Sequence, residues 1–216
     1  MAKIRTLVQL QDLLDQSLGW RLKDISNLKI AAKSGGISQK TFIRAGIPLV
    51  YAHWEGFIKE ASIAYLNFVD NQGLTYNELK GCFALFGLKG KLDTLGDSKK
   101  THANLVALEF IISRLGDKSQ LQLAHAVNTE ANLTSRVFSN IAASLDLSTD
   151  AYETKYNLID ESLVYRRNKV AHGEFLDLEM PDFLDLSEEV LNMMRSYKND
   201  VLNAAVSEQY KRLVTA

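Results

Sequence analysis

The sequence has few of the residues that cross-link, stiffen or break a chain. It contains one cysteine, two prolines and twelve glycines in 216 residues. The single cysteine, Cys82, excludes an internal disulfide and a thiolate metal site, as is typical of proteins from the reducing cytosol. So few prolines and glycines leave little room for long structureless linkers. We therefore expect one globular domain over residues 1–216.

A strong charge imbalance and long apolar runs are also missing. The formal net charge is −1, so any binding of nucleic acid must come from a local basic patch. No uninterrupted apolar run approaches the roughly 20 residues that cross a bilayer. The N-terminal segment carries charges and lacks the apolar region of a signal peptide. We expect a cytoplasmic protein that does not contact a membrane.

Helix-forming residues are abundant and turn clusters are few, which predicts an all-α fold. Apolar residues recur at helical spacing in four long segments. These predicted long helices cover residues 3–33, 38–70, 150–173 and 183–213. Shorter helices are predicted over 75–85, 105–115 and 133–145. The sequence therefore predicts a bundle of about four long helices with short helices inserted in the middle.

Two interruptions of this pattern are predicted. Pro48 lies inside the second long helix, where the lost backbone donor favours a kink or a break. Gly87, Gly90 and Gly96 interrupt the middle region, so residues 87–91 are interpreted as a flexible basic turn. This turn lacks the G-x4-G-K-[ST] spacing of a phosphate-binding loop.

The strongest candidate site is the segment YRRNKVAHGE at residues 165–174. In an unbroken helix Asn168 and His172 lie about 40° apart, whereas Arg167 and His172 lie about 140° apart. Arg167 and His172 can therefore meet in two ways. Either the helix loosens near Gly173, or the same segments of two subunits face each other across a two-fold axis.

The residue types of this segment suit phosphodiester chemistry. His172 can act as a general acid or base near neutral pH, and Arg167 offers a planar fork of donors to a phosphate. Asn168 can orient the imidazole or the scissile phosphate, and Arg166 and Lys169 add positive charge. No carboxylate cluster accompanies them and no two histidines have metal-ligand spacing, so we expect neither a metal nor another cofactor. The alternative is a solvated basic face with His172 as a helix C-cap.

A second cluster lies at YAHWEGFIK, residues 51–59. Glu55 and Lys59 have the i,i+4 order of a helix ion pair beside a core tryptophan, Trp54. The functional alternative is that His53 or Glu55 borders the site and orients Arg167 and His172.

These motifs resemble the HEPN domain superfamily. Residues 167–172 match its R-x4-H signature, and residues 51–59, 132–133 and 166–174 are similar to a bacterial subfamily of presumed nucleases. The resemblance spans roughly residues 40–200. It implies a dimeric helical bundle whose paired arginines and histidines cleave RNA without a metal and leave 2′,3′-cyclic phosphates. Arg167 and His172 would be catalytic and Asn168 supporting. It also implies a role in toxin–antitoxin systems or antiphage defence, with a partner protein.

One departure from the resemblance affects regulation. Some HEPN toxins carry a tyrosine two residues after the histidine, where an antitoxin modifies them. Glu174 occupies this position, so we do not expect control by adenylylation there. Two other functions stay open. One is a non-catalytic module that binds RNA, a nucleotide or a protein, and the other is a structural dimer whose arginines pair with the acids of residues 177–182.

Overall fold

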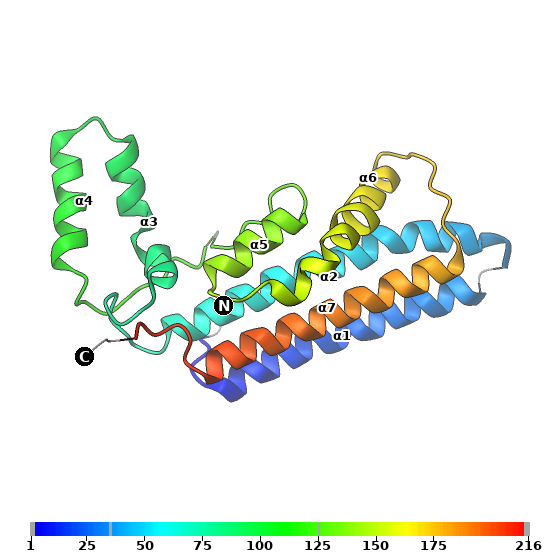
Figure 1. Ribbon diagram of the computed structural model, residues 1–216, viewed down its shortest axis with the longest axis horizontal. Helices are drawn as coiled ribbons and strands as arrows, with labels where there is room; N and C mark the ends of the chain where they lie inside the picture. The colour runs from blue at the N-terminus through cyan, green and yellow to red at the C-terminus, as the bar shows by residue number, and fades with distance from the viewer. Residues whose placement is uncertain (1–2, 35, 125, 214–216) are drawn as a thin grey trace.

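The computed structural model describes residues 3–34, 36–124 and 126–213. Three long helices lie side by side along the length of the molecule: α1 (Leu7–Ser34), α2 (Gln39–Asp70) and α7 (Met180–Val206) (Figure 1). Each turns an apolar stripe inward, as the periodicity predicts. Leu10, Leu14 and Ile25 of α1, for example, are fully buried. The short 3-10 helix η1 (Gly36–Ser38) precedes α2. The predicted all-α class is confirmed, because the described residues outside helices form only isolated bridges.

The start of α1 is fixed by a capping box. The Gln9 backbone N–H donates to Thr6 Oγ1 at 3.2 Å, and Gln9 Oε1 accepts from the Thr6 N–H at 3.3 Å. This reciprocal pair satisfies donors that a helix start leaves free. The helix therefore begins at Leu7. The apolar pattern alone predicts a start four residues earlier, at residue 3.

Of the kink or break predicted at Pro48, the break is wrong. Helix α2 continues through the proline from Gln39 to Asp70. Proline removes one intrahelical hydrogen bond. Ile47, which precedes the proline, and Val50, two residues after it, are fully buried against the core. Burial of these two side chains favours the helical path on both sides of the proline.

The long helix predicted over residues 150–173, the third of the four, is a composite of three short ones. A 3-10 helix, η2 (Asp150–Lys155), leads into a π-helix, η3 (Leu158–Tyr165), and then into the α-helix α6 (Arg166–Ala171). This composite packs over α2 (Figure 1). Ile159 and Leu163 of η3 enter the core with no exposed surface. The change of helix type therefore comes immediately before the candidate site.

The inserted segment forms α3 (Gly81–Asp97), α4 (Thr101–Ser113) and α5 (Ser135–Ser144). Helices α3 and α4 make a hairpin that projects away from the long bundle (Figure 1). The flexible turn predicted at residues 87–91 is wrong, because α3 is helical there. Gly87 serves close packing instead, since a Cβ atom would lie 2.5 Å from the Tyr76 ring.

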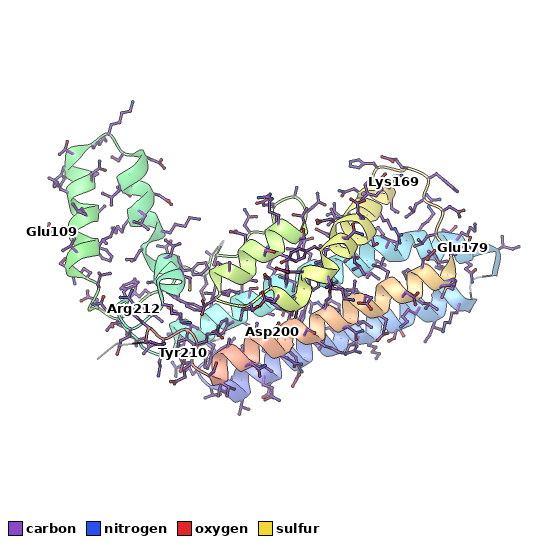
Figure 2. All side chains as sticks on the ribbon, viewed as in Figure 1. Glu109, Lys169, Glu179, Asp200, Tyr210 and Arg212 are labelled. Atoms are coloured by element: carbon purple, nitrogen blue, oxygen red, sulfur yellow. The ribbon has the colours of Figure 1, made fainter. Side chains whose placement is uncertain are left out.

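The chain after α7 anchors the inserted segment to the bundle. Helix α7 ends at Val206, seven residues before the predicted end at Leu213. Tyr210 packs edge-on against Phe68 and Phe83, and its carbonyl accepts the Lys80 N–H at 2.9 Å. Figure 2 shows Tyr210 and Arg212 beyond the end of α7. No helix in the described parts of the chain is both long and apolar enough to cross a bilayer.

Candidate active site at the end of α6

The π-helix that precedes the R-x4-H segment is tied to helix α5. Asp160 of η3 caps the start of α5, because its carboxylate accepts the Ser135 N–H at 2.7 Å and the Ser135 hydroxyl at 2.6 Å. Acidic groups at a helix N-terminus satisfy free backbone donors and complement the helix dipole. The turn that carries Arg167 therefore follows a segment that is hydrogen-bonded to α5.

The segment ends in a Schellman motif at Gly173. The glycine has φ +74°, and its N–H donates to the Val170 carbonyl at 3.1 Å. The Glu174 N–H reaches back to the Lys169 carbonyl at 2.9 Å. This pair of bonds defines the motif, in which a left-handed residue follows the last helical turn. His172 is therefore the C-cap residue, and its side chain is exposed.

Arg167 points the other way, toward α2. Its guanidinium carbon lies 4.5 Å from the centroid of the Tyr51 ring, and Nη1 donates to Asn168 Oδ1 at 2.8 Å. The side chain is half-buried. A guanidinium over an aromatic face is attracted by the ring quadrupole, and the attraction strengthens where water is excluded. Arg167 is thus held in a defined orientation before any substrate arrives.

The Tyr51 ring is fixed in turn by the segment before α5. Its hydroxyl accepts the Leu133 N–H at 2.7 Å, and the residue is 2 % exposed. Burial raises the pKa of Tyr51 to about 12, helped by the Glu55 carboxylate and opposed by the Leu133 N–H and the Arg167 charge. The hydroxyl is therefore protonated at neutral pH.

Arg167 and His172 do not meet within one chain. Helix α6 stays α-helical to Ala171, so it does not loosen between the two residues. The amide oxygen of Asn168 is occupied by Arg167, while the Asn168 carbonyl accepts the His172 N–H at 2.9 Å. The first of the two geometric routes that the sequence permits, a helix that loosens near Gly173, is therefore not what this chain shows.

The structure places His53 away from this group, so the expectation that it borders the site is corrected. Its Nε2 atom lies 2.8 Å from Asp24 Oδ2 on α1, and its ring packs edge-on to Trp20 at 5.2 Å. Two positions further along a helix turn the side chain by about 200° from Tyr51. Burial lowers the pKa of His53, and this effect outweighs Asp24, which raises it.

Of the other residues in the 51–59 motif, Trp54 lies in the core and Glu55 lies near Tyr51. Trp54 is fully buried and packs against Phe138 at 5.4 Å, as expected of a core tryptophan. No ion pair joins Glu55 to Lys59 among the described residues. Glu55 instead lies on the Tyr51 side of α2, one turn further along, where its charge acts on the Tyr51 hydroxyl.

Further cations and aromatic rings surround the motif. The Lys169 ammonium lies 4.9 Å from the Tyr165 ring, and the Arg44 guanidinium lies 5.8 Å from the Phe175 ring. Figure 2 shows Lys169 near the far end of α6. Tyr165 and Phe175 are 50 % and 75 % exposed, so two large aromatic side chains flank the R-x4-H segment at the surface.

Sequence reasoning did not assign a role to Arg44 or Tyr51. A usable signal was present, because Arg44, Tyr51 and Glu55 are spaced i, i+7 and i+11 and so share one face of a helix. That face of α2 is turned toward the composite helix. The identity of the neighbouring segment, however, depends on tertiary packing and not on this spacing.

Potential metal ligands are not clustered in the described residues, and the thiol of Cys82 lies in α3, outside the R-x4-H segment. The described parts of the chain contain no group of three or more His, Cys, Asp or Glu side chains that could hold a metal ion. Cys82 is half-buried in α3, and burial raises the pKa of its thiol. Such a thiol is a packing group rather than a nucleophile.

The RiboL-PSP-HEPN family model matches the chain over residues 16–203. The match covers well over half of the chain and contains both motifs and the composite helix. No curated protein and no solved structure matches the chain. The resemblance to HEPN domains that the motifs indicate is therefore confirmed at the level of the family.

Proposed function

The chain belongs to the RiboL-PSP-HEPN family, and from this premise we propose that it is a metal-independent endoribonuclease. Membership of the HEPN family suggests a nuclease or other RNA-related role. The proposed reaction is cleavage of an RNA phosphodiester to a 2′,3′-cyclic phosphate and a 5′-hydroxyl. The observation that carries the proposal is the different placement of the two motif residues. Arg167 is half-buried and oriented by Tyr51, whereas His172 is exposed at the helix end.

Arg167 supplies a prepared site for the phosphate. Its guanidinium has five N–H donors, and within the described residues only the bond to Asn168 is formed. The remaining donors can bind phosphate oxygens and stabilise the charge that develops in the transition state. Because Tyr51 and Asn168 already orient the group, substrate binding needs little reorganisation.

We propose that the active unit is a homodimer with two R-x4-H segments face to face. A monomer would leave Tyr165 and Phe175 largely exposed on either side of the motif. Aromatic residues and arginine are enriched in the cores of protein interfaces. A two-fold contact there would cover both rings and bring His172 of one subunit toward Arg167 of the other, which a single chain does not achieve.

In this dimer each site would use one His172 as the general base. One His172 takes the proton of the ribose 2′-hydroxyl while O2′ bonds to phosphorus. The bond from phosphorus to O5′ breaks, and the leaving oxygen takes a proton from water. Arg167 stabilises the added negative charge on the phosphoryl oxygens. The ribose supplies the nucleophile, so the protein needs only positioning, proton transfer and charge stabilisation.

The experiment is RNA cleavage by the purified protein in excess EDTA. We expect cleavage products that end in 2′,3′-cyclic phosphate, and we expect Arg167→Ala and His172→Ala each to lower the rate by at least about a hundredfold. His102→Ala is the matched control, because it removes another exposed histidine, on α4. Wild-type activity in both motif variants would contradict the assignment.

A second candidate is a non-catalytic module that binds RNA or a nucleotide. The observation in its favour is the net charge of −1, since a nuclease for RNA commonly has a strongly basic surface. It predicts RNA binding that is unchanged by His172→Ala and is not followed by cleavage. Measuring both RNA binding and RNA cleavage for the wild type and His172→Ala therefore separates the two functions.

We also propose that cleavage serves a toxin–antitoxin system or antiphage defence in the cytoplasm, with a partner protein that restrains it. Uncontrolled cutting of cellular RNA would stop growth. Expression of the wild-type chain should therefore inhibit growth and degrade RNA, whereas expression of His172→Ala should do neither. Equal growth of both strains, with intact RNA, would contradict this role.

A further inference from the structure

We infer that Tyr51 is a positioning residue for Arg167, through which the motif at residues 51–59 acts on the R-x4-H segment. The inference rests on the proposed ribonuclease function for its kinetic consequence, but its geometric claim stands without it. The two residues are 116 positions apart in the sequence and come from α2 and α6. The Arg167 guanidinium carbon lies 4.5 Å from the Tyr51 ring centroid.

The ring is a rigid support, because its surroundings fix it at both ends. Tyr51 is 2 % exposed, and the residues beside it on α2, Val50 and Trp54, are fully buried. A close-packed core leaves such a ring one rotamer. Its hydroxyl is bonded to the Leu133 N–H at 2.7 Å, which prevents the ring from tilting away from α6. The guanidinium therefore rests on a ring that is both buried and hydrogen-bonded.

Three segments meet at this contact. Helix α2 supplies Tyr51, the segment before α5 supplies the Leu133 N–H, and α6 supplies Arg167. The start of α5 is itself capped by Asp160 of the π-helix that leads into α6. The arrangement closes a loop of contacts from α6 through α2 and α5 back to α6. A displacement of any one segment would change the orientation of the guanidinium.

Tyr51 acts through Arg167 and not on the substrate. Its hydroxyl is buried and already accepts a backbone N–H, so it is not placed to exchange a proton with RNA. Glu55 lies one turn further along the same face of α2, where its negative charge lies near the Tyr51 hydroxyl. The aromatic face is thus the part of Tyr51 that Arg167 needs, and the hydroxyl fixes that face.

Three variants separate the ring from the hydroxyl and from core packing. Tyr51→Phe keeps the ring and removes only the hydroxyl. Tyr51→Leu removes the ring under Arg167. Tyr65→Leu is the matched control, because Tyr65 is a fully buried tyrosine of the same helix that packs on Phe83, 5.7 Å away, rather than on Arg167.

The first measurement is the NMR signal of the Arg167 side-chain Nε–H in ¹⁵N-labelled full-length protein, assigned with Arg167→Lys. The ring current of Tyr51 shifts this signal upfield. We expect the shift to persist in Tyr51→Phe and Tyr65→Leu and to disappear in Tyr51→Leu. An Arg167 signal that is the same in Tyr51→Leu and wild type would overturn the inference, whether or not the protein cleaves RNA.

The second measurement is the steady-state kinetics of RNA cleavage. We expect Tyr51→Leu to lower kcat by roughly thirtyfold or more with little change in KM, and Tyr51→Phe to lower it less than about threefold. In an Arg167→Lys background the further effect of Tyr51→Leu should be less than about threefold, because both changes remove one interaction. A kcat for Tyr51→Leu no lower than that of Tyr65→Leu would overturn the positioning role. Absence of cleavage by the wild type would instead refute the proposed function and leave the NMR result to decide.

Discussion

The imidazole of His53 is fixed to α1 by Asp24, 2.8 Å away, on the side of α2 that faces away from Tyr51. This pairing gives a prediction for the pH dependence of stability. Burial lowers the pKa of His53 below its ordinary value of 6.5. At a pH between the lowered pKa and 6.5, the His53 side chain is protonated in the unfolded chain but neutral in the folded protein. The free energy of unfolding therefore decreases as the pH falls from about 6.5 toward the pKa of the folded state.

The corresponding variant is His53→Gln, which removes the titrating group while its amide can still donate to Asp24. Urea unfolding at pH 7.5 and pH 5.5 measures the effect. We expect wild type to lose more stability than the variant between the two pH values. A difference between the two proteins that does not change with pH would show that His53 is not buried as a neutral group.

Gly173 is predicted to control the position of His172. The glycine has φ +74°, and a Cβ atom there would meet nothing within 4 Å, so only backbone strain opposes a larger residue. Gly173→Ala should therefore lower the free energy of unfolding by about 1 kcal/mol. RNA cleavage should fall further than this loss explains, because the turn that holds His172 is displaced.

Gly96→Ala is the matched control for this change. Gly96 lies in the helix α3, and its Cβ position is also open. Alanine is the better helix former, so this variant should be more stable than wild type by about 0.5 kcal/mol and fully active. Thermal unfolding and cleavage assays of both variants make the comparison. Equal activity of Gly173→Ala and Gly96→Ala would contradict a role for the turn.

Arg166 and Lys169 are predicted to contact the RNA backbone. Both are half-buried cations of α6 that flank Arg167 and carry no ion pair among the described residues. Each contact with single-stranded RNA contributes about 0.7 to the slope of log affinity against log salt. The double variant Arg166→Ala/Lys169→Ala should therefore bind weakly to all RNA sequences and lose about 1.4 from that slope.

Lys23→Ala serves as the control, because Lys23 is an exposed cation of α1. Its salt slope should equal that of wild type. Binding can be measured with inactive His172→Ala protein, so that the RNA stays intact during the titration. An unchanged slope in the double variant would place the RNA elsewhere on the molecule.

The long helices were predictable because burial dictates them. The stripe of Leu10, Leu14 and Ile25 gives α1 directly. The spacing of apolar residues, however, does not distinguish an α-helix from a π-helix. Ile159 and Leu163 have a spacing that suits both an α-helix and a π-helix, so the composite at residues 150–171 could not be read from it.

The middle of the chain was mispredicted for a related reason. Glycine disfavours helix by about 1 kcal/mol per residue, which suggested a turn at residues 87–91. The penalty is offset at Gly87, where the missing side chain lets α3 approach Tyr76 and the Gln120 carbonyl closely. Local propensity does not contain this tertiary contact.

The R-x4-H pair was identifiable from spacing and residue type, whereas the support beneath it was not. Tyr51 and His53 lie on opposite faces of α2, so only one of them can face α6. Sequence spacing shows that the two residues cannot both face α6, but it does not show which of them does. The choice of Tyr51 follows from how α1 covers the His53 side, through Asp24 and Trp20.

The central claim is that Arg167 of one subunit and His172 of the other form one site. Mixing the inactive variants Arg167→Ala and His172→Ala tests it most directly, because a mixed dimer contains one intact pair. With free exchange, half of the dimers are mixed and each has one of two sites, so about a quarter of wild-type activity should return. If the mixture stays inactive while size measurements show that mixed dimers form, the shared site is contradicted.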